Sequence, residues 1–358
     1  MIKIKKEFND YINSTKAKPL FFTGDALAIL QQIPDNSIDC CITSPPYWNK
    51  REYDGGGLGL EESSEDYIEN LSKVLMEVYR VLKDTGSLWL NIGDSYHKKS
   101  LMNIPWRVAI NLTNNGYILR NTIIWNKLKG APDNSKDKLR NIYEPIFHFV
   151  KKQKYFYNID SCRNIPKSAL SRTGKVISAT GVSGVKYRKK IQASLVLSDS
   201  EKQAALLALD NILEDIKNGR LEDFRMVIRG EGRVTHSDSE KLSGRAKELK
   251  EKGFYFLKYH PGGSKPSDIW EIIPEDTQGR KKHFAPFPEE LCVRPLKLTV
   301  PYKGVVLDPF CGTGTTNLSA YKMGHKSIGI DLSSSYLKIA NNRIDQCTVE
   351  DNLFEENK

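Results

Sequence analysis

A rigid turn, Ser44-Pro45-Pro46-Tyr47, follows the short apolar stretch at residues 38–43. Two successive prolines fix the backbone φ angle and contribute carbonyl groups without N–H groups. The apolar stretch is predicted to be a buried strand, and ligands of open α/β sheets bind beyond the carboxyl ends of such strands. The turn therefore offers two neighbouring acceptors, the Ser44 hydroxyl and the Pro45 carbonyl, and Tyr47 as an exposed aromatic face.

Two acceptors on a rigid turn suit methyl transfer to an exocyclic amino group of a base. Such an amine is a poor nucleophile because its lone pair is delocalised into the ring. Acceptors that bind its hydrogens can draw the nitrogen toward sp³ geometry, which is catalysis by positioning and electrostatics. The base must also leave the stack and be held by an aromatic face, for which Tyr47 and Trp48 are candidates. Taken alone, the tetrapeptide could equally be a turn with a core tyrosine.

A glycine-rich segment at residues 308–315, DPFCGTGT, lies between an expected strand at 304–308 and an expected helix at 314–323. Glycines let a ligand approach the backbone closely, and a helix N-terminus offers free N–H donors. Asp331 ends the next expected strand, where an acid binds ribose hydroxyls in dinucleotide folds. Asn317 replaces the third glycine of the dinucleotide fingerprint, and no Gly-Lys-Ser/Thr follows. These departures favour an adenosyl ligand without a pyrophosphate over NAD or a nucleoside triphosphate.

Alternating strands and helices are expected to position both segments. The spacing of apolar residues predicts helices at 67–82, 104–115 and 335–344 and strands at 38–43, 87–92, 122–125, 146–150, 304–308 and 326–331. This alternation predicts an α/β fold with a doubly wound, mostly parallel, Rossmann-like sheet. The rhythm is interrupted at residues 161–282, so the chain is divided into a catalytic half (1–160), an insert (161–282) and a cofactor-binding half (283–358).

The insert carries most of the net charge of the 358-residue chain. It holds 24 Lys and Arg against 16 Asp and Glu, so it contributes +8 to a formal net charge of +10. This asymmetry suits a polyanionic partner. No apolar run reaches the ~18 residues that a membrane span needs, and no signal peptide is readable, so a cytoplasmic protein is expected. The six cysteines lack metal-site spacing and are expected to be reduced thiols, and no metal is expected.

Together these motifs resemble the β-class of S-adenosylmethionine-dependent DNA amino-methyltransferases, in which the catalytic segment precedes the cofactor turn. The matching segments are GDAL at 24–27, SPPY at 44–47, LWLNIGD at 88–94, HFAPFP at 283–288, DPFCGTGT at 308–315 and GID at 329–331. The resemblance covers most of 20–158 and 283–344. It implies a methyltransferase fold, S-adenosylmethionine as cofactor and a target-recognition region in the insert.

The resemblance also implies roles for individual residues. The catalytic residues would be Ser44, Pro45, Pro46 and Tyr47. The cofactor-binding residues would be Asp25 near the adenine, Asp331 on the ribose, Phe284 and Pro286 near the methionine end, and Asp308, Phe310, Gly312, Gly314 and Thr315 in the turn. The residues expected to contact DNA, from composition and position, are Trp48, Arg188, Lys189, Arg225, Arg229, Arg233 and Arg245. The loops at 49–59 and 130–141 are predicted to become ordered on DNA.

The predicted reaction is methylation of cytosine N4 in duplex DNA, because Ser-Pro-Pro-Tyr is commoner in cytosine-N4 enzymes of the resembling family and Asp-Pro-Pro-Tyr in adenine-N6 enzymes. Adenine N6 is the alternative, and RNA or protein-glutamine methylation is a further one. A nucleic-acid-binding module with an inactive site is a third hypothesis. Methylation of cytosine C5 is disfavoured, because it needs a nucleophilic cysteine, usually after a proline, and no cysteine here follows one. A restriction–modification system with a cognate endonuclease is the expected context.

Overall fold

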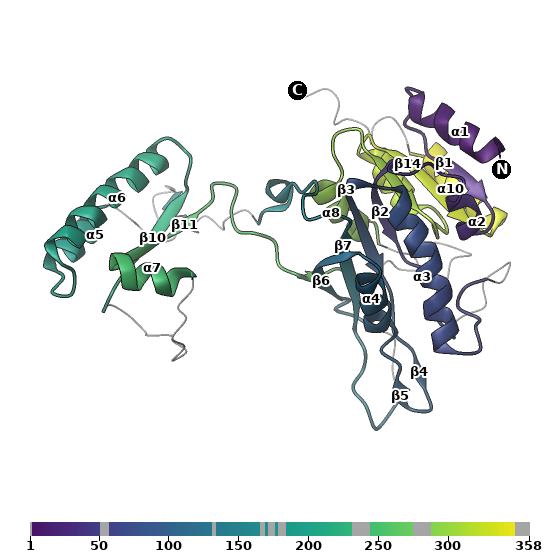
Figure 1. Ribbon diagram of the computed structural model, residues 1–358, viewed down its shortest axis with the longest axis horizontal. Helices are drawn as coiled ribbons and strands as arrows, with labels where there is room; N and C mark the ends of the chain where they lie inside the picture. The colour runs from purple at the N-terminus through teal and green to yellow at the C-terminus, as the bar shows by residue number, and fades with distance from the viewer. Residues whose placement is uncertain are drawn as a thin grey trace. The chain divides into compact units, whose positions relative to one another are not determined.

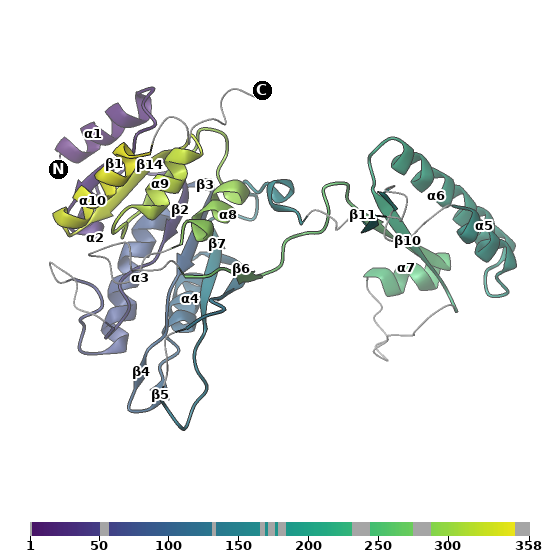
Figure 2. The ribbon, with the colours of Figure 1, turned by 180° about the vertical axis from the view of Figure 1, so that it is seen from behind.

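The computed structural model describes residues 2–50, 57–130, 134–164, 169–170, 176–177, 184–230, 244–274 and 288–347. The chain divides into two compact units. The sheet unit comprises Met1–Cys162 and Ser267–Lys358, and the insert unit comprises Arg163–Pro266. Both are visible in Figure 1 and, from behind, in Figure 2. In the part of the chain that the structure describes, every helix is too short or too polar to span a bilayer.

The sheet unit is built on an eight-stranded sheet in the order β1-β14-β13-β2-β3-β7-β6-β12. The strands are β1 (Leu20–Thr23), β14 (Lys326–Asp331), β13 (Val305–Asp308), β2 (Ile38–Thr43), β3 (Leu82–Asn91), β7 (Tyr143–Val150), β6 (Ile118–Asn126) and β12 (Ile269–Glu271). Strand β7 pairs antiparallel with β3 and β6, and all other pairs in this sheet are parallel. The predicted mostly parallel α/β sheet is confirmed.

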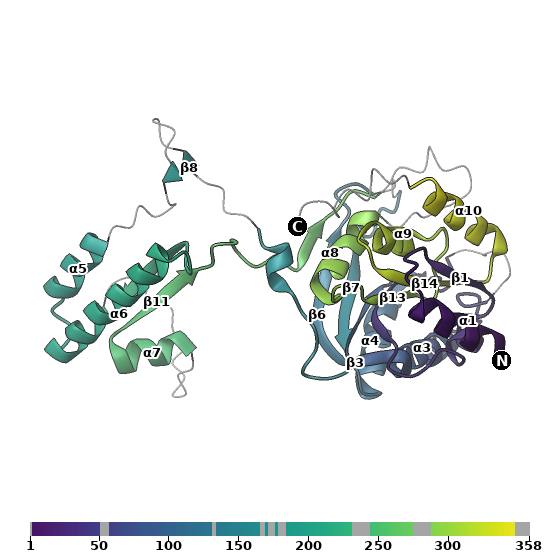
Figure 3. The ribbon, with the colours of Figure 1, turned by 90° about the horizontal axis from the view of Figure 1, so that it is seen from above.

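Helices cover both faces of the sheet, as Figure 3 shows. On one face lie α2 (Ala26–Leu30), α3 (Ser64–Val81) and α4 (Ile104–Asn114); on the other lie α8 (Glu289–Thr299), α9 (Thr315–Lys322) and α10 (Ser334–Asp345), and α1 (Ile2–Asn13) packs at the β1 end. Strand β2 is buried along its whole length, with Cys41 in the core beneath α3 and Cys40 in the core beneath α8. Both faces are therefore apolar, which is why this strand reads as a continuous apolar run rather than an alternation.

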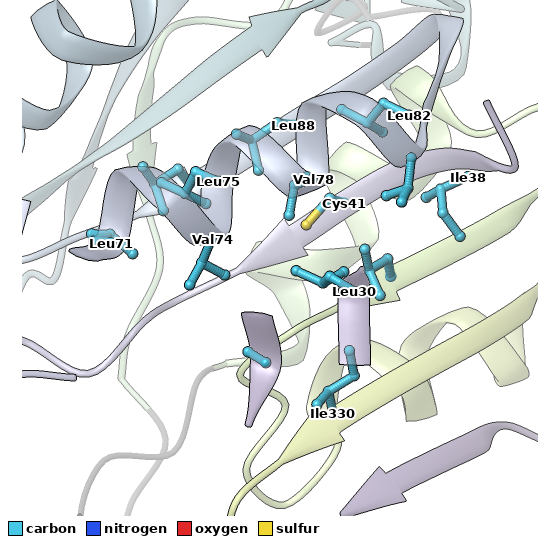
Figure 4. Close-up of a cluster of buried hydrophobic side chains, with 14 of the residues drawn as sticks. Leu30, Ile38, Cys41, Leu71, Val74, Leu75, Val78, Leu82, Leu88 and Ile330 are labelled. Carbon is cyan, nitrogen blue, oxygen red and sulfur yellow. The ribbon is translucent and has the colours of Figure 1, made fainter. Parts of the chain in front are cut away.

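Helix α3 supplies many of the side chains in the hydrophobic core on the face of the sheet that contains Cys41 (Figure 4). Ser63 caps its N-terminus by accepting a hydrogen bond from the Asp66 N–H, and Leu71, Val78 and other apolar residues at helical spacing are buried. The helix was predicted to end in a turn at residues 84–86, followed by a strand from residue 87. This predicted boundary is wrong. Strand β3 begins at Leu82, which is fully buried and pairs with Ile38 of β2.

The insert unit has a hydrophobic core of its own. It contains α5 (Gly184–Ala193), α6 (Asp199–Lys217), β10 (Asp223–Ile228), α7 (Gly244–Lys252) and β11 (Phe254–Tyr259), with short strands β8 (Ala169–Leu170) and β9 (Val176–Ile177). Strands β10 and β11 form an antiparallel pair against which Leu209 and Ile212 of α6 are buried. Strand β12 lies within the range 161–282 assigned to the insert, but the structure places it in the main sheet beside β6.

Candidate active site

The 44–47 turn leaves the carboxyl end of β2 and is held by hydrogen bonds on both sides. The Tyr67 hydroxyl, on α3, donates to the Pro46 carbonyl at 2.7 Å. The Ser95 hydroxyl, after β3, donates to the Trp48 carbonyl at 2.6 Å. Two neighbouring elements therefore fix the backbone of the turn, as a site that positions a reactant requires.

The Tyr47 hydroxyl lies at the centre of a polar network. It is 3.3 Å from the Ser44 hydroxyl, 3.2 Å from Asn91 Oδ1 and 2.9 Å from Glu144 Oε2. Asn91 Nδ2 donates to the same Glu144 oxygen at 3.2 Å. Lys127 Nζ lies 2.5 Å from the other oxygen, Glu144 Oε1, in an ion pair whose side chains are only 24% and 17% exposed.

The network determines which way its protons point. Burial, and next the charge of Glu144, raise the pKa of Tyr47 well above its usual value, so the phenol keeps its proton. The carboxylate can only accept, and a hydrogen bond to a charged acceptor is the stronger one, so the Tyr47 proton goes to Glu144. Ser44 must then donate to the Tyr47 oxygen. This leaves the lone pairs of the Ser44 oxygen available to accept a hydrogen bond from another group.

Trp48 does not form the exposed second wall predicted for it. Its ring is 5% exposed, and its Nε1 donates to the Glu61 carbonyl at 3.0 Å. The predicted direct contact between Trp48 and DNA is therefore not supported, because the indole is buried in the core. Tyr47 itself is half-buried rather than fully exposed, and a Cβ at Gly93 would come within 2.4 Å of its Cε2 atom.

The glycine-rich turn between β13 and α9 has the backbone shape of a ligand cradle. Gly312 and Gly314 adopt φ angles of 51° and 73°, in the left-handed region that favours glycine. A Cβ at Gly314 would lie 2.8 Å from the Cβ of Ala340. The Asp331 carboxylate accepts hydrogen bonds from the N–H groups of Gly312 and Ser333, at 2.8 Å each, and so ties β14 to the turn.

A direct hydrogen bond joins the two candidate segments. The Thr43 hydroxyl, one residue before the 44–47 turn, donates to Asp308 Oδ1 at 2.7 Å. The Phe310 N–H donates to the same oxygen at 3.1 Å. Burial raises the pKa of Asp308 to about 6, partly offset by the hydrogen bond from Thr43, and burial also raises the pKa of Asp331. The two segments therefore lie side by side around partly desolvated carboxylates.

The residues present fit an adenosyl ligand. Gly312 has no Cβ to obstruct a ligand at the turn, whereas Gly314 is required by the close packing of Ala340, and each Asp331 oxygen retains acceptor capacity for a ribose hydroxyl. Asp25 is exposed and caps α2 by accepting from the Ala28 N–H at 2.9 Å. Asp25 follows β1, which is the neighbour of β14 in the sheet, and the Gly24 N–H donates to the Asp331 carbonyl at the end of β14. Of the other predicted cofactor residues, Phe310 is partly buried and Thr315 begins α9; Phe284 and Pro286 lie outside the described residues.

Two of the arginines predicted to contact DNA are engaged within the insert unit. Arg229 donates to Glu201 at 2.9 Å and to the carbonyls of Val196 and Lys250, so it joins α6 to the end of α7. Base reading by Arg229 is therefore not supported, because its guanidinium is used internally. Arg188 forms an ion pair with Asp210 on α6. Lys189, Arg225 and Arg245 are exposed, and Arg233 lies outside the described residues.

Sequence reasoning missed two members of the network, Lys127 and Glu144, and assigned no role to a third, Asn91, although Asn91 lies in the matching segment at 88–94. Glu144 is the second residue of β7, 97 positions after Tyr47, and no periodicity or motif links the two. Its only signal is position: an acid at the start of a strand whose neighbour, β3, ends beside the turn. Among the described residues no group of three or more His, Cys, Asp and Glu could hold a metal ion.

The fold and the site together define a doubly wound α/β methyltransferase. The chain belongs to the DNA methylase family of N6 and N4 methyltransferases, whose family profile matches residues 38–342. The type II methyltransferase M.SfiI of Streptomyces fimbriatus is 31% identical, over 90% of this chain and 91% of its own length. The predicted membership of the DNA amino-methyltransferases is confirmed, and the chain is an S-adenosylmethionine-dependent DNA methyltransferase.

Solved structures share the fold at low sequence identity. The PvuII DNA methyltransferase, described as cytosine-N4-specific, is 16% identical with a TM-score of 0.57 over 94% of this chain and 91% of its own. A DNA modification methylase of Thermus thermophilus, solved as a complex with S-adenosylmethionine, is 20% identical with a TM-score of 0.50 over 93% of each chain.

Proposed function

We propose that this enzyme transfers a methyl group from S-adenosylmethionine to the exocyclic N4 amine of a cytosine flipped out of duplex DNA. The observation that carries the proposal is the proton arrangement at Tyr47. It makes the Ser44 oxygen an acceptor at the carboxyl end of β2, beside the Asp308 turn. The serine at the head of the tetrapeptide favours cytosine, and the name of the PvuII enzyme agrees with that choice.

In the proposed mechanism, the Ser44 oxygen and the Pro45 carbonyl accept hydrogen bonds from the two amine hydrogens of the base. These bonds favour a tetrahedral nitrogen, whose lone pair would then be available to the methyl group instead of being delocalised into the ring, and the nitrogen would release one of its two protons to solvent as the N–C bond forms. S-adenosylmethionine supplies an activated methyl group on its sulfonium. The Asp331 carboxylate would bind the ribose, and the turn at residues 308–315 would fix the adenosyl group.

The target strand is proposed to be recognised by the insert unit. Its remaining exposed cations include Lys189, Arg225 and Arg245, and arginine can read guanine through two hydrogen bonds. M.SfiI is a type II methyltransferase by name, and a cognate restriction endonuclease is the corresponding partner proposed here.

The direct test is base-resolved methylation sequencing of DNA from cells that express the protein, with nucleoside analysis of the same DNA. The proposal expects N4-methylcytosine at one short motif. N6-methyladenine in its place would refute the choice of base. The appearance of 5-methylcytosine alone, or of no modified base, would refute amino methylation.

The Ser44→Ala variant tests the catalytic role of the turn. The variant should lose turnover by about 10- to 100-fold, because one hydrogen bond worth roughly 1.5–3 kcal/mol is lost in the transition state. Its affinity for S-adenosylmethionine, measured by calorimetry, should be unchanged. Unaltered turnover would show that the Ser44 oxygen does not bind the amine.

A further inference from the structure

Two loops of the sheet unit extend beyond the edge of the sheet at which the 44–47 turn lies. Strands β2, β3 and β6 run in the same direction, so their carboxyl ends meet at this edge. After β3 the chain forms the hairpin β4–β5 (Tyr96–His97 and Ser100–Leu101). After β6 the described residues 127–130 and 134–142 form a loop that leads to β7. Figure 1 shows both continuing past the sheet side by side.

The hairpin braces the loop. Lys99 Nζ, at the hairpin tip, forms an ion pair with Asp137 Oδ2 of the loop at 2.7 Å. Lys138 Nζ lies 5.2 Å from the centre of the Tyr96 ring, within the range of a cation–π contact. These contacts join the hairpin to the loop at residues 137 and 138.

Leu139 is exposed at this braced position. Its side chain is 89% exposed, the highest value among the large hydrophobic residues described in the sheet unit. A single exposed leucine on a protein surface needs no explanation. Leu139, however, lies between two cations, Lys138 and Arg140, in a loop beside the catalytic edge, and all three side chains face solvent.

The charge of the two loops suits a polyanion. The described residues at 96–101, 127–130 and 134–141 carry seven cations, which are Lys98, Lys99, Lys127, Lys129, Lys136, Lys138 and Arg140. Asp137 is the one acid among these described residues. Lys127 pairs with Glu144 and Lys99 with Asp137, and the six cations other than Lys127 are on exposed residues. An apolar side chain surrounded by cations is complementary to duplex DNA, because the stacked bases are apolar and the phosphates on either side of them are negatively charged.

We infer that Leu139 is a wedge that enters the DNA stack at the step from which the target base is extruded, while the neighbouring cations bind phosphates. This inference rests on the proposed base-flipping function. Proteins that distort DNA insert leucine and other apolar side chains between base steps, and the inserted side chain replaces stacking lost by the bases. Extruding a base requires a few kcal/mol of unstacking and unpairing, and less when the base is mismatched.

The test compares Leu139→Ala with wild type on two unmethylated duplexes that contain the sequence motif at which the enzyme acts. One duplex is fully paired, and the other carries a mismatch at the target base. We expect kcat/KM of Leu139→Ala to fall about tenfold on the paired duplex and to return within about twofold of wild type on the mismatched one, because flipping is then easier. Ile110→Ala is the matched control, since Ile110 is 61% exposed on α4 of the same unit.

Two outcomes would overturn the inference. One is a Leu139→Ala variant with wild-type kcat/KM on the paired duplex. The other is an equal loss on both duplexes, which would indicate a general role in binding rather than in flipping. The base itself is identified from the wild-type product, so a finding of N6-methyladenine would refute cytosine N4 and leave the comparison at Leu139 valid. Melting temperatures of the exposed-site variants should match wild type and exclude misfolding.

Discussion

Glu144 is connected to Ser44, the serine proposed to be catalytic, through Tyr47, and the Glu144→Gln substitution tests this chain of hydrogen bonds. The substitution keeps the shape of the side chain and removes its charge. A glutamine can donate to the Tyr47 oxygen, which the carboxylate cannot do. The Tyr47 proton is then free to point at Ser44, where it would occupy the lone pair that the base amine needs.

The expected loss follows from the contacts. Glu144 receives a hydrogen bond from Tyr47 at 2.9 Å in a half-buried site, and its other oxygen pairs with Lys127. A hydrogen bond to a charged group in such a site is worth roughly 1.5–3 kcal/mol, which corresponds to a fall in kcat of about 10- to 100-fold. The affinity for S-adenosylmethionine should be unchanged, because the network does not include the 308–315 turn.

The assay is single-turnover methyl transfer to duplex DNA, with Glu271→Gln, an exposed acid on β12, as the control. A double-mutant cycle adds Tyr47→Phe. Because Glu144 is proposed to act through the Tyr47 hydroxyl, the double variant should be little worse than Tyr47→Phe alone. A kcat of Glu144→Gln within twofold of wild type, or additive losses in the cycle, would refute the reasoning.

Two further predictions concern the packing and the ionisation of the site. Gly93→Ala should lower kcat by about 100-fold, because a Cβ at Gly93 would lie 2.4 Å from Tyr47 Cε2 and displace the ring; a kinetic assay beside a thermal melt would separate this loss from unfolding. The pKa of Asp308 is raised to about 6, so the folded state binds a proton more tightly than the unfolded chain and this carboxyl favours folding increasingly as pH falls. The free energy of unfolding of wild type, relative to Asp308→Asn, should therefore increase by about 1 kcal/mol between pH 7 and pH 5 in denaturant titrations, and a constant difference would contradict the assignment.

Local patterns were sufficient for the parts of the site that are contiguous in sequence. The strand Ile38–Thr43 and the turn after it were predictable, because an apolar run followed by two prolines has few other conformations. The same holds for the glycine turn that precedes α9. The prediction that Trp48 is exposed was wrong because the burial of its side chain is not determined by the neighbouring sequence. Its Nε1 donates to the Glu61 carbonyl and its own carbonyl accepts from Ser95, and both partners come from segments distant in sequence.

Contacts between distant segments explain the remaining differences. Glu144 reaches Tyr47 only because β7 runs antiparallel between β3 and β6, and a pattern of apolar residues gives strand positions without their neighbours or directions. Strand β3 begins at Leu82 because Leu82 pairs with Ile38 of β2, whereas the residues at 84–86 by themselves resemble a turn. Both features are fixed by tertiary packing, which overrides local preference.

The order in which the segments 44–47 and 308–315 occur in the chain does not affect the geometry of the site. Parallel strands present their carboxyl ends at one edge, whatever their order in the sequence. Strand β13 pairs with β2, so the turn after β13 lies beside the turn after β2, although Thr43 and Asp308 are 265 residues apart. The segment between them can therefore hold a separately folded insert unit with its own core without disturbing the site. It follows that the Thr43–Asp308 hydrogen bond and the pairing of β13 with β2, rather than the chain connection, fix the turn at residues 308–315 against the turn at residues 44–47.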